Sequence, residues 1–287
     1  MAASDLAVLA DVKTWLSGSS GIGTTDDTLL GRLITDISGA IYAYLGRPSL
    51  IPRSVTERRD GNGKQRIYLR QFPAVSIVSL LINDIAVPAA PLPQAGSAWP
   101  QAGYLLEPWD GAPPGRIQAL DLFGHWSLGQ ACELFHVGRQ NVVVTYTSGY
   151  QISAEAAIVP AAPGPYTVSA QAPFGPWASD AGVVYANGNT LTKVASAPGA
   201  GQYAVAGGVY TFSAADAGAS VLVSYGFIPA AINNACIEWV AERYRYRTRI
   251  GQSAQTVAGQ QTASYSLKDM PDFIRASLDP YRSVVGV

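Results

Sequence analysis

The chain has 287 residues, with 19 lysine and arginine residues against 20 aspartate and glutamate residues, and a formal net charge of −1. Such a balance provides no global basic field for binding nucleic acid or an acidic membrane. No apolar run approaches the ~20 residues of a transmembrane helix, so we expect no membrane partner. Only 14% of the residues are charged. The surface therefore has uncharged areas that can be buried in protein contacts without the desolvation cost of unpaired charges.

Two helices are expected in the N-terminal part of the chain. In residues 5–16 the apolar side chains, including Trp15, recur on one face of a short helix. Thr24 or Thr25 is expected to cap a longer helix that follows the helical period to about Leu45. Gly46 and Pro48 should then end it, since glycine favours the C-terminal cap and proline cannot continue a helix.

Strands are expected next. Residues 54–72 form two short runs around Asp60-Gly61-Asn62-Gly63, a pattern that favours a β-hairpin. Residues 75–84 and 141–150 each predict a strand. Residues 86–115 are rich in proline, alanine and glycine, and they predict a long loop.

Residues 152–226 differ from the rest of the chain in composition. They hold one basic residue, Lys193, and three acidic ones, Glu155, Asp180 and Asp216. Short apolar runs separated by turn residues predict a small all-β domain of about five or six strands. Because the strands on either side of it have similar sequences, we expect a domain inserted into a loop.

The C-terminal part predicts one long helix and one short helix. Residues 228–251 should form the long helix, with Pro229 in its first turn and Gly251 at its end. Residues 252–266 are polar and weakly patterned, so we expect them to be mobile in the free subunit. The short helix is expected to begin at Pro271 and to be disrupted near Pro280.

No group of residues points to an active site. Lys64 follows glycines, but the spacing of a phosphate-binding loop is absent, so a hairpin is the simpler interpretation. His125, Cys132 and His136 could supply three zinc ligands, yet their spacing matches no strong pattern and partly buried neutral side chains explain them better. We therefore expect no enzyme activity, no metal and no cofactor. The two cysteines, Cys132 and Cys236, are far apart in the sequence and favour a reduced protein.

Four arginines gather near the end of the long helix, at Arg243, Arg245, Arg247 and Arg249. They point in several directions, because 100° per residue puts Arg243 and Arg247 on one face and the other two on another. Three interpretations remain open. They complement the helix dipole, they pair with carboxylates of a neighbouring subunit, or, as the third choice, they hold DNA.

The order of these segments resembles a known family. In chain order they are LADVKTWL, DDTLLGRLITDISGAIYAYLGR, DGNGKQRIYLRQFPAVSIVSLLIND, NVVVTYTSGY, IPAAINNACIEWVAERYRYRTRIG and DFIRASLDPYR. Together they are similar to the head-tail connector (head-completion, adaptor) proteins of tailed bacteriophages. The resemblance covers about 1–151 and 227–287. It departs from the family at 152–226, since the usual member passes directly from the TYTSGY strand to the long helix.

The resemblance implies an α+β fold, with a helical core and β-hairpins, to which this chain adds the inserted all-β domain. It implies a structural protein of the virion neck, assembled in the host cytoplasm, that forms a usually dodecameric ring under the portal protein. Such a ring extends the channel, lets genomic DNA pass without sequence-specific binding, and docks a tail-side or stopper protein. The alternative is a peripheral β-decorated virion protein, such as a head-decoration or tail-fibre attachment module.

Three sets of residues are the candidate contact sites. The four arginines are candidates for the subunit interface. Residues 252–287 are expected to become ordered against the portal or a neighbouring subunit, with Tyr265, Leu267, Phe273, Tyr281 and Arg282 as the candidate contacts. Candidates for the channel or a hairpin tip are Arg58, Arg59 and Lys64.

Overall fold

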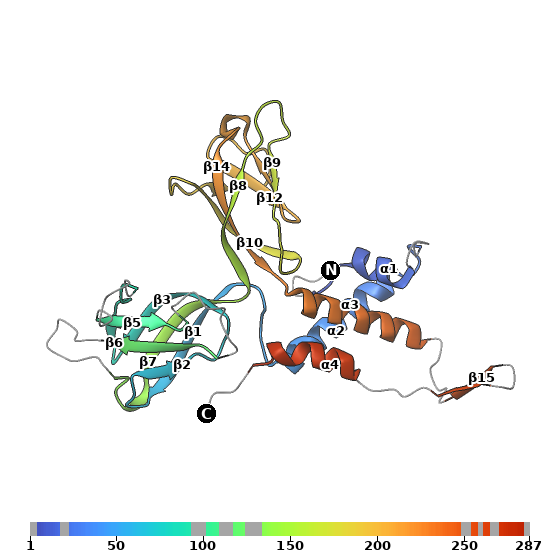
Figure 1. Ribbon diagram of the computed structural model, residues 1–287, viewed down its shortest axis with the longest axis horizontal. Helices are drawn as coiled ribbons and strands as arrows, with labels where there is room; N and C mark the ends of the chain where they lie inside the picture. The colour runs from blue at the N-terminus through green and yellow to red at the C-terminus, as the bar shows by residue number, and fades with distance from the viewer. Residues whose placement is uncertain are drawn as a thin grey trace. The chain divides into compact units, whose positions relative to one another are not determined.

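The computed structural model describes residues 5–17, 23–92, 102–108, 117–123, 134–247, 254–257, 261–264 and 270–283. In these residues the chain is mixed α+β, with four α-helices and several sheets whose strand pairs are almost all antiparallel (Figure 1). The chain divides into two compact units. The helical unit comprises Met1–Pro48, Phe174–Pro176 and Ile228–Arg282, and the β unit comprises Ser49–Pro173, Trp177–Phe227 and Ser283–Val287.

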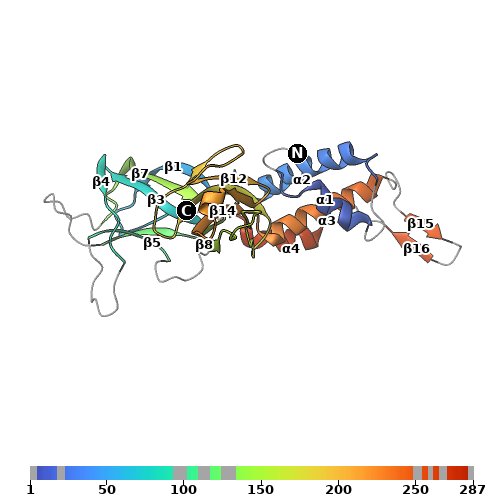
Figure 2. The ribbon, with the colours of Figure 1, turned by 90° about the horizontal axis from the view of Figure 1, so that it is seen from above.

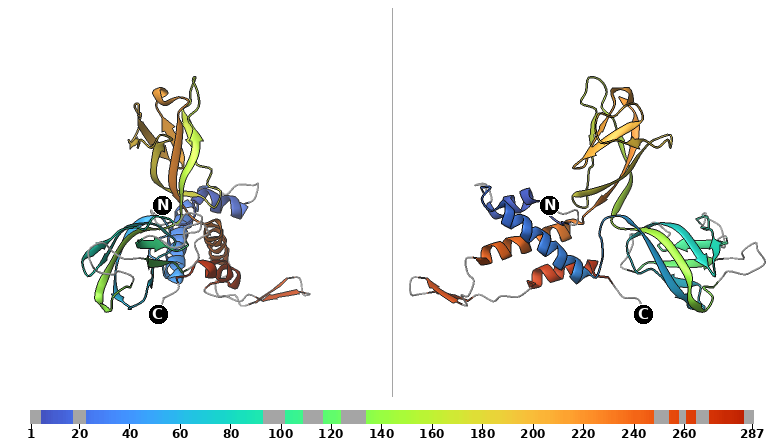
Figure 3. Two further views of the ribbon diagram at one scale, coloured as in Figure 1. Left: turned by 60° about the vertical axis from the view of Figure 1, so that its left-hand side comes forward. Right: turned by 180° about the vertical axis from the view of Figure 1, so that it is seen from behind.

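The helical unit is built around one central helix. Helix α3 (Ala230–Tyr246) packs against α1 (Leu9–Ser17), α2 (Asp27–Leu45) and α4 (Asp272–Leu278). Figure 3 shows these helices from two further sides. Their shared core consists of buried apolar side chains, among them Val12, Leu30, Ile34, Ile41, Ile232, Trp239, Val240, Ile274 and Leu278. The N-terminal and C-terminal parts of the chain therefore fold into one unit.

The helix ends confirm some of the sequence predictions and correct others. Gly46 caps α2 in the left-handed conformation, with φ of 62°, as predicted. The predicted threonine cap is wrong, because Asp26 is the N-cap residue and its side chain makes no capping hydrogen bond. Trp15 was predicted on the buried face of the first helix, but it is 53% exposed. The long C-terminal helix ends at Tyr246, and its predicted end at Gly251 lies outside the described residues.

Polar side chains fix the N-terminal segment inside the helical unit. The backbone N–H of Leu6 donates to Ser38 Oγ of α2 at 2.9 Å, and Asn233 Nδ2 of α3 donates to the Leu6 carbonyl at 2.8 Å. Ser38 Oγ also lies 3.7 Å from Cys236 Sγ. Burial raises the pKa of the Cys236 thiol to about 12, so this cysteine stays protonated in the folded protein.

A short segment from the middle of the sequence also belongs to the helical unit. The Ala230 N–H, at the start of α3, donates to the Phe174 carbonyl at 2.9 Å, and the Ile228 N–H donates to the Pro176 carbonyl at 3.0 Å. Gly175 lies between these acceptors with φ of 145°, and a Cβ placed there would be 1.9 Å from the Ile228 carbonyl oxygen. Glycine is required there by both the backbone angle and the close approach.

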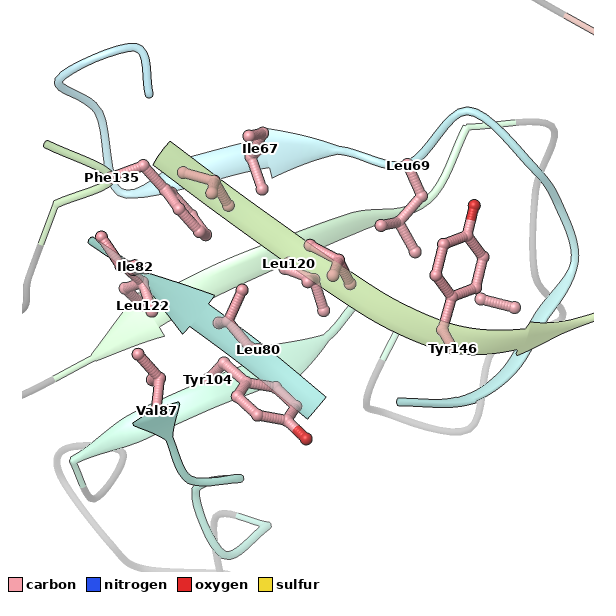
Figure 4. Packing of buried hydrophobic residues seen from close by; sticks show 13 residues of the cluster. Ile67, Leu69, Leu80, Ile82, Val87, Tyr104, Leu120, Leu122, Phe135 and Tyr146 are labelled. Atoms are coloured by element: carbon pink, nitrogen blue, oxygen red, sulfur yellow. The ribbon is translucent and has the colours of Figure 1, made fainter. Parts of the chain in front are cut away.

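The first part of the β unit consists of two sheets with one core, here called the β1–β7 sandwich. One sheet has the order β1-β7-β3-β4 and the other has the order β2-β6-β5. Side chains from both sheets meet in the core, and Figure 4 shows Leu80, Ile82, Leu120, Leu122 and Phe135 among them. The strand bounds are β1 (Arg53–Gly61), β2 (Arg66–Tyr68), β3 (Ala74–Ile82), β4 (Ile85–Val87), β5 (Gly103–Leu106), β6 (Ala119–Phe123) and β7 (Gly138–Ser148).

The strand pairing corrects two sequence predictions. The expected hairpin around residues 60–63 is wrong, because β1 pairs with β7 and β2 pairs with β6. The turn carries the chain from one sheet to the other, and Asn62 stabilises it by donating to the Arg66 carbonyl and accepting from the Lys64 N–H. The expected loop over 86–115 is also wrong in part, because it holds the end of β4 and all of β5.

The second part of the β unit is the β8–β14 sandwich. One sheet has the order β10-β14-β8 and the other has the order β11-β12-β13-β9. A buried core between them includes Val183, Val223, Tyr203, Tyr210 and Tyr225. The bounds are β8 (Gln151–Ile158), β9 (Thr167–Ser169), β10 (Trp177–Tyr185), β11 (Thr192–Lys193), β12 (Gln202–Ala206), β13 (Val209–Phe212) and β14 (Ser220–Phe227). The segment is all-β as predicted apart from one 3-10 turn, but it has seven strands instead of five or six.

Between α3 and α4 the chain forms a short hairpin. Strands β15 (Ala254–Val257) and β16 (Gln261–Ser264) pair antiparallel and are labelled in Figure 2. The sequence predicted no regular structure there, so this hairpin is a correction. None of the described helices is long and apolar enough to cross a membrane.

Candidate functional site

The clearest cluster of charged and aromatic side chains lies where α3 ends beside the start of α2. Arg247 Nη1 lies 3.0 Å from Asp26 Oδ1, and Arg247 Nη2 lies 3.1 Å from Asp26 Oδ2. The Tyr244 hydroxyl donates a short hydrogen bond to Asp26 and accepts one from Arg247 at 3.0 Å. We call these three residues the helix-end cluster. Its arginine binds the carboxylate through two parallel hydrogen bonds, the geometry for which guanidinium is suited.

The three residues of the helix-end cluster stabilise one another's ordinary protonation states. The hydrogen bonds from Arg247 and then Tyr244 lower the pKa of the Asp26 carboxyl. The hydrogen bond to Asp26 raises the pKa of Tyr244 and of Arg247. The Arg247 guanidinium also lies 4.2 Å from the centre of the Tyr244 ring, within cation–π range. All three groups therefore keep their ordinary charge states at neutral pH.

The neighbouring carboxylate makes a second connection between helices. Lys13 Nζ of α1 lies 2.8 Å from Asp27 Oδ1. The adjacent Asp26 and Asp27 thus connect the start of α2 to α3 on one side and to α1 on the other. Both carboxylates also lie at the start of α2, where the helix dipole favours negative charge.

The structure separates the four arginines that the sequence grouped together. Arg247 is paired within its own chain. Arg243 and Arg245 lie in the last turn of α3, where a positive charge is favoured by the helix dipole, with Arg243 half-buried and Arg245 exposed. Arg249 lies outside the described residues. A contact of Arg243 and Arg245 with another subunit stays a prediction.

The candidates in the C-terminal segment are placed in different ways. Phe273 lies on α4 and is 55% exposed. The Arg282 guanidinium lies 5.5 Å from the centre of the Tyr44 ring, and the Tyr44 hydroxyl donates to Asp279 in the turn that follows α4. These contacts hold the end of α4 against α2 in the free chain. Tyr281 in the same turn is half-buried, and Tyr265 and Leu267 lie outside the described residues.

The three candidates near residue 60 do not share one tip. Arg58 and Arg59 lie within strand β1, so their expected place at a hairpin tip is wrong. Arg59 Nη1 lies 3.6 Å from the carboxylate of Glu57. Lys64 is exposed in the turn between β1 and β2. The expected place of these three residues along a DNA channel stays a prediction.

Glu57 belongs to a buried polar network that the sequence did not indicate. It is 7% exposed, and its carboxylate accepts a short hydrogen bond from the hydroxyl of the fully buried Tyr146. It also accepts the Arg70 backbone N–H at 3.1 Å, and the Tyr146 hydroxyl accepts the Gln71 N–H at 3.0 Å. The network joins β1, β7 and the segment after β2, a structural role with no free reactive group.

A second ion-pair cluster also came only with the fold. Arg66 binds Asp121 through Nε at 2.6 Å and Nη2 at 2.5 Å, and its Nη2 lies 3.3 Å from Glu107 Oε1. Arg66 and Asp121 are direct partners in the β2–β6 ladder. No local sequence signal could have identified this pair, because its members lie 55 residues apart.

In the β8–β14 sandwich each carboxylate accepts a hydrogen bond from a tyrosine. The pairs are Tyr225 with Glu155 at 2.5 Å, Tyr203 with Asp180 at 2.9 Å, and Tyr185 with Asp216 at 2.6 Å. The one lysine, Lys193, lies 3.1 Å from Asp180. All four charged residues of 152–226 therefore have partners inside the sandwich.

Metal-binding groups can be assessed in the described residues only. Within them no group of three or more histidine, cysteine, aspartate or glutamate side chains is placed to hold a metal ion. His125 and Cys132, two of the three zinc candidates, lie outside the described residues. The carboxylates described above all serve structural pairs.

Comparison with protein-family models and with curated proteins finds no match to this chain.

Proposed function

We propose that the chain is a structural component of the neck of a tailed bacteriophage, a head-to-tail adaptor that assembles as a homo-oligomeric ring under the portal protein. In this role it extends the DNA channel and docks a tail-side or stopper protein. The protein works through its surfaces and catalyses no reaction. A dodecamer is the expected ring, and genomic DNA passes through it without sequence-specific binding.

One observation carries the proposal: the N-terminal and C-terminal segments that resemble the adaptors pack into one helical unit. Helices α1 and α2 come from the first 45 residues, α3 and α4 come from the last 58, and α3 contacts all of the others. A resemblance that rested on unrelated segments would not require their helices to share a core. The shared core is what a single ring-forming body would need.

Within this proposal the parts of the chain have separate roles. Residues 152–226 form an inserted domain, since the core adaptor would pass directly from the strand ending near Ser148 to α3. Arg243 and Arg245 contact a neighbouring subunit, as the resemblance to the adaptors implies for the arginine-rich end of the long helix. Residues 252–287 meet the portal or a neighbouring subunit, and the candidates among the described residues are Phe273, Tyr281 and Arg282.

The test is direct imaging of assembled particles. Virions that carry the full chain with an affinity tag are imaged by electron cryo-microscopy, and the neck is averaged along its axis. We expect one ring of tagged subunits between portal and tail. Tag density on the capsid surface or on fibres would instead identify a peripheral decoration protein, the alternative class, and would refute the adaptor role.

A pair of variants tests the assignment of the arginines. Arg243→Ala with Arg245→Ala should reduce ring assembly on isolated portal while the far-ultraviolet circular dichroism of the monomer stays unchanged, because these side chains are expected to pair across subunits. Arg53→Ala is the matched control, since Arg53 is an exposed arginine of the β unit that belongs to no candidate contact site. If the double variant assembles as well as this control, the interface does not run through the end of α3.

A further inference from the structure

The β8–β14 sandwich has two outer faces that carry no charged strand residue. In the β10-β14-β8 sheet, Val221 and Val223 point into the core, so their neighbours Ser220, Leu222 and Ser224 point outward. The strand register places other uncharged residues beside them, namely Ala156, Ile158, Gly182 and Val184. Ile158 is 69% exposed. This face is uncharged and partly apolar, and most of its side chains are small.

The opposite sheet presents a similar outer face. Tyr203, Tyr210 and Phe212 point into the core, so the residues between them point outward. The register aligns these outward residues in two rows, which are Ala204, Thr211 and Thr167, and Ala206, Val209 and Ser169. Val209 is 41% exposed. The two outer faces therefore lie on opposite sides of one core and differ in their side chains.

The lack of free charge on these two outer faces favours an uncharged partner. The four charged residues of 152–226 are already paired inside the sandwich, so none of them is needed for a partner. A strongly charged partner, such as nucleic acid, would lose water around its charges and gain no ion pair in return. A second uncharged sheet of small side chains carries no such penalty, and two sheets pack well at about 10 Å.

We propose that the β8–β14 sandwiches of neighbouring copies of this chain pack sheet against sheet, with the β10-β14-β8 face of one copy on the β11-β12-β13-β9 face of the next. Two different faces on opposite sides of one body make a head-to-tail contact, which closes into a ring when the rotation between copies permits. The proposal rests on the homo-oligomer of the proposed function, but it does not depend on the portal or the tail.

The size of the faces sets the expected strength. Three strands about 4.8 Å apart, each contributing about five residues of ~3.4 Å, span roughly 250 Å². A stable pair of proteins buries about 800 Å² on each partner. The contact is therefore too small to hold two free copies together by itself, and it acts in addition to other contacts within a ring. An experiment must therefore cross-link this weak contact covalently, because no stable dimer is expected.

Disulfide trapping in the full chain provides this test. In a Cys132→Ser background, the buried Cys236 remains protected, and Ile158→Cys is combined with Val209→Cys. Under mild oxidation at high protein concentration, we expect a ladder of dimers, trimers and larger species that collapses when reductant is added. Each single variant should give no cross-linked species, because residue 158 of one copy meets residue 209 of the next copy and not residue 158 of that copy.

The matched control pairs Ile158→Cys with Val137→Cys, a site that is 81% exposed in the β1–β7 sandwich. A ladder from this control, or none from the test pair, overturns the proposal. Dimers from a single variant would indicate a same-face contact and would also overturn it. If circular dichroism shows that the test pair misfolds, Ala156→Cys with Thr211→Cys replaces it. A ladder without an axial ring in the virion neck would retain this contact and reject the adaptor role.

Discussion

Replacing Tyr146 by phenylalanine would test whether the buried network of the β1–β7 sandwich stabilises the fold. The ring of Tyr146 is fully buried on β7, and phenylalanine keeps its volume, so no cavity arises. The hydroxyl alone is lost, and with it the hydrogen bond to Glu57 and the acceptor for the Gln71 N–H. Both groups would be left with fewer partners inside the sandwich.

The expected loss of stability follows from these two contacts. A hydrogen bond to a charged group contributes about 1.5–3 kcal/mol, and a buried group left unpaired costs about 1–3 kcal/mol. Glu57 keeps the Arg70 N–H and the nearby Arg59, and Gln71 is only half-buried, so the full sum does not apply. We expect Tyr146→Phe to lower the free energy of unfolding of this sandwich by about 2–3 kcal/mol.

The assay must report on this sandwich alone, because a chain with two compact units need not unfold in one step. Hydrogen exchange of the β7 amides, measured by mass spectrometry against urea concentration, gives the local free energy of opening. With a urea slope of about 1–3 kcal/mol/M, the midpoint should fall by on the order of 1 M.

The control is Tyr68→Phe, since Tyr68 is 43% exposed on β2. An exposed substitution of this kind should change stability by less than about 0.5 kcal/mol. If Tyr146→Phe costs no more than this control, the hydroxyl has no net stabilising role and the argument from the network fails.

Three further predictions concern other parts of the chain. Gly175→Ala should lower the melting temperature of the helical unit, because its Cβ would meet the Ile228 carbonyl oxygen at 1.9 Å, and unchanged melting would contradict this. The β8–β14 sandwich should lose stability as pH rises above about 10. Burial raises the pKa of Tyr225 to about 12 and also raises that of Tyr203, so both phenols stay protonated in the folded sandwich but ionise at lower pH in the unfolded chain. A pH titration by circular dichroism that is flat to pH 12 would refute this prediction. Cys236 should resist iodoacetamide in the native protein and react in urea, as mass spectrometry of its peptide would show, because the thiol is buried and its pKa is raised to about 12.

The sequence alone determined the elements that depend on neighbouring residues. The period of 3.6 and the following glycine placed α2 and its end at Gly46, because a left-handed cap is a local requirement on one residue. Short apolar runs separated by turn residues identified 152–226 as β structure. The scarcity of charge in that segment was also visible, although the sequence did not show that each charge has a partner.

Only the tertiary structure decided which elements meet. Strand β1 pairs with β7, Arg53 lying opposite Ser148, and not with the strand that follows it across a good turn sequence. The helix-end cluster joins Asp26 to Arg247 across 221 residues, and the Tyr146–Glu57 bond spans 89. Local sequence limits backbone angles and the direction of side chains. The choice of a distant partner depends on how the whole chain buries its apolar surface, and only the fold could show that Arg247 binds Asp26.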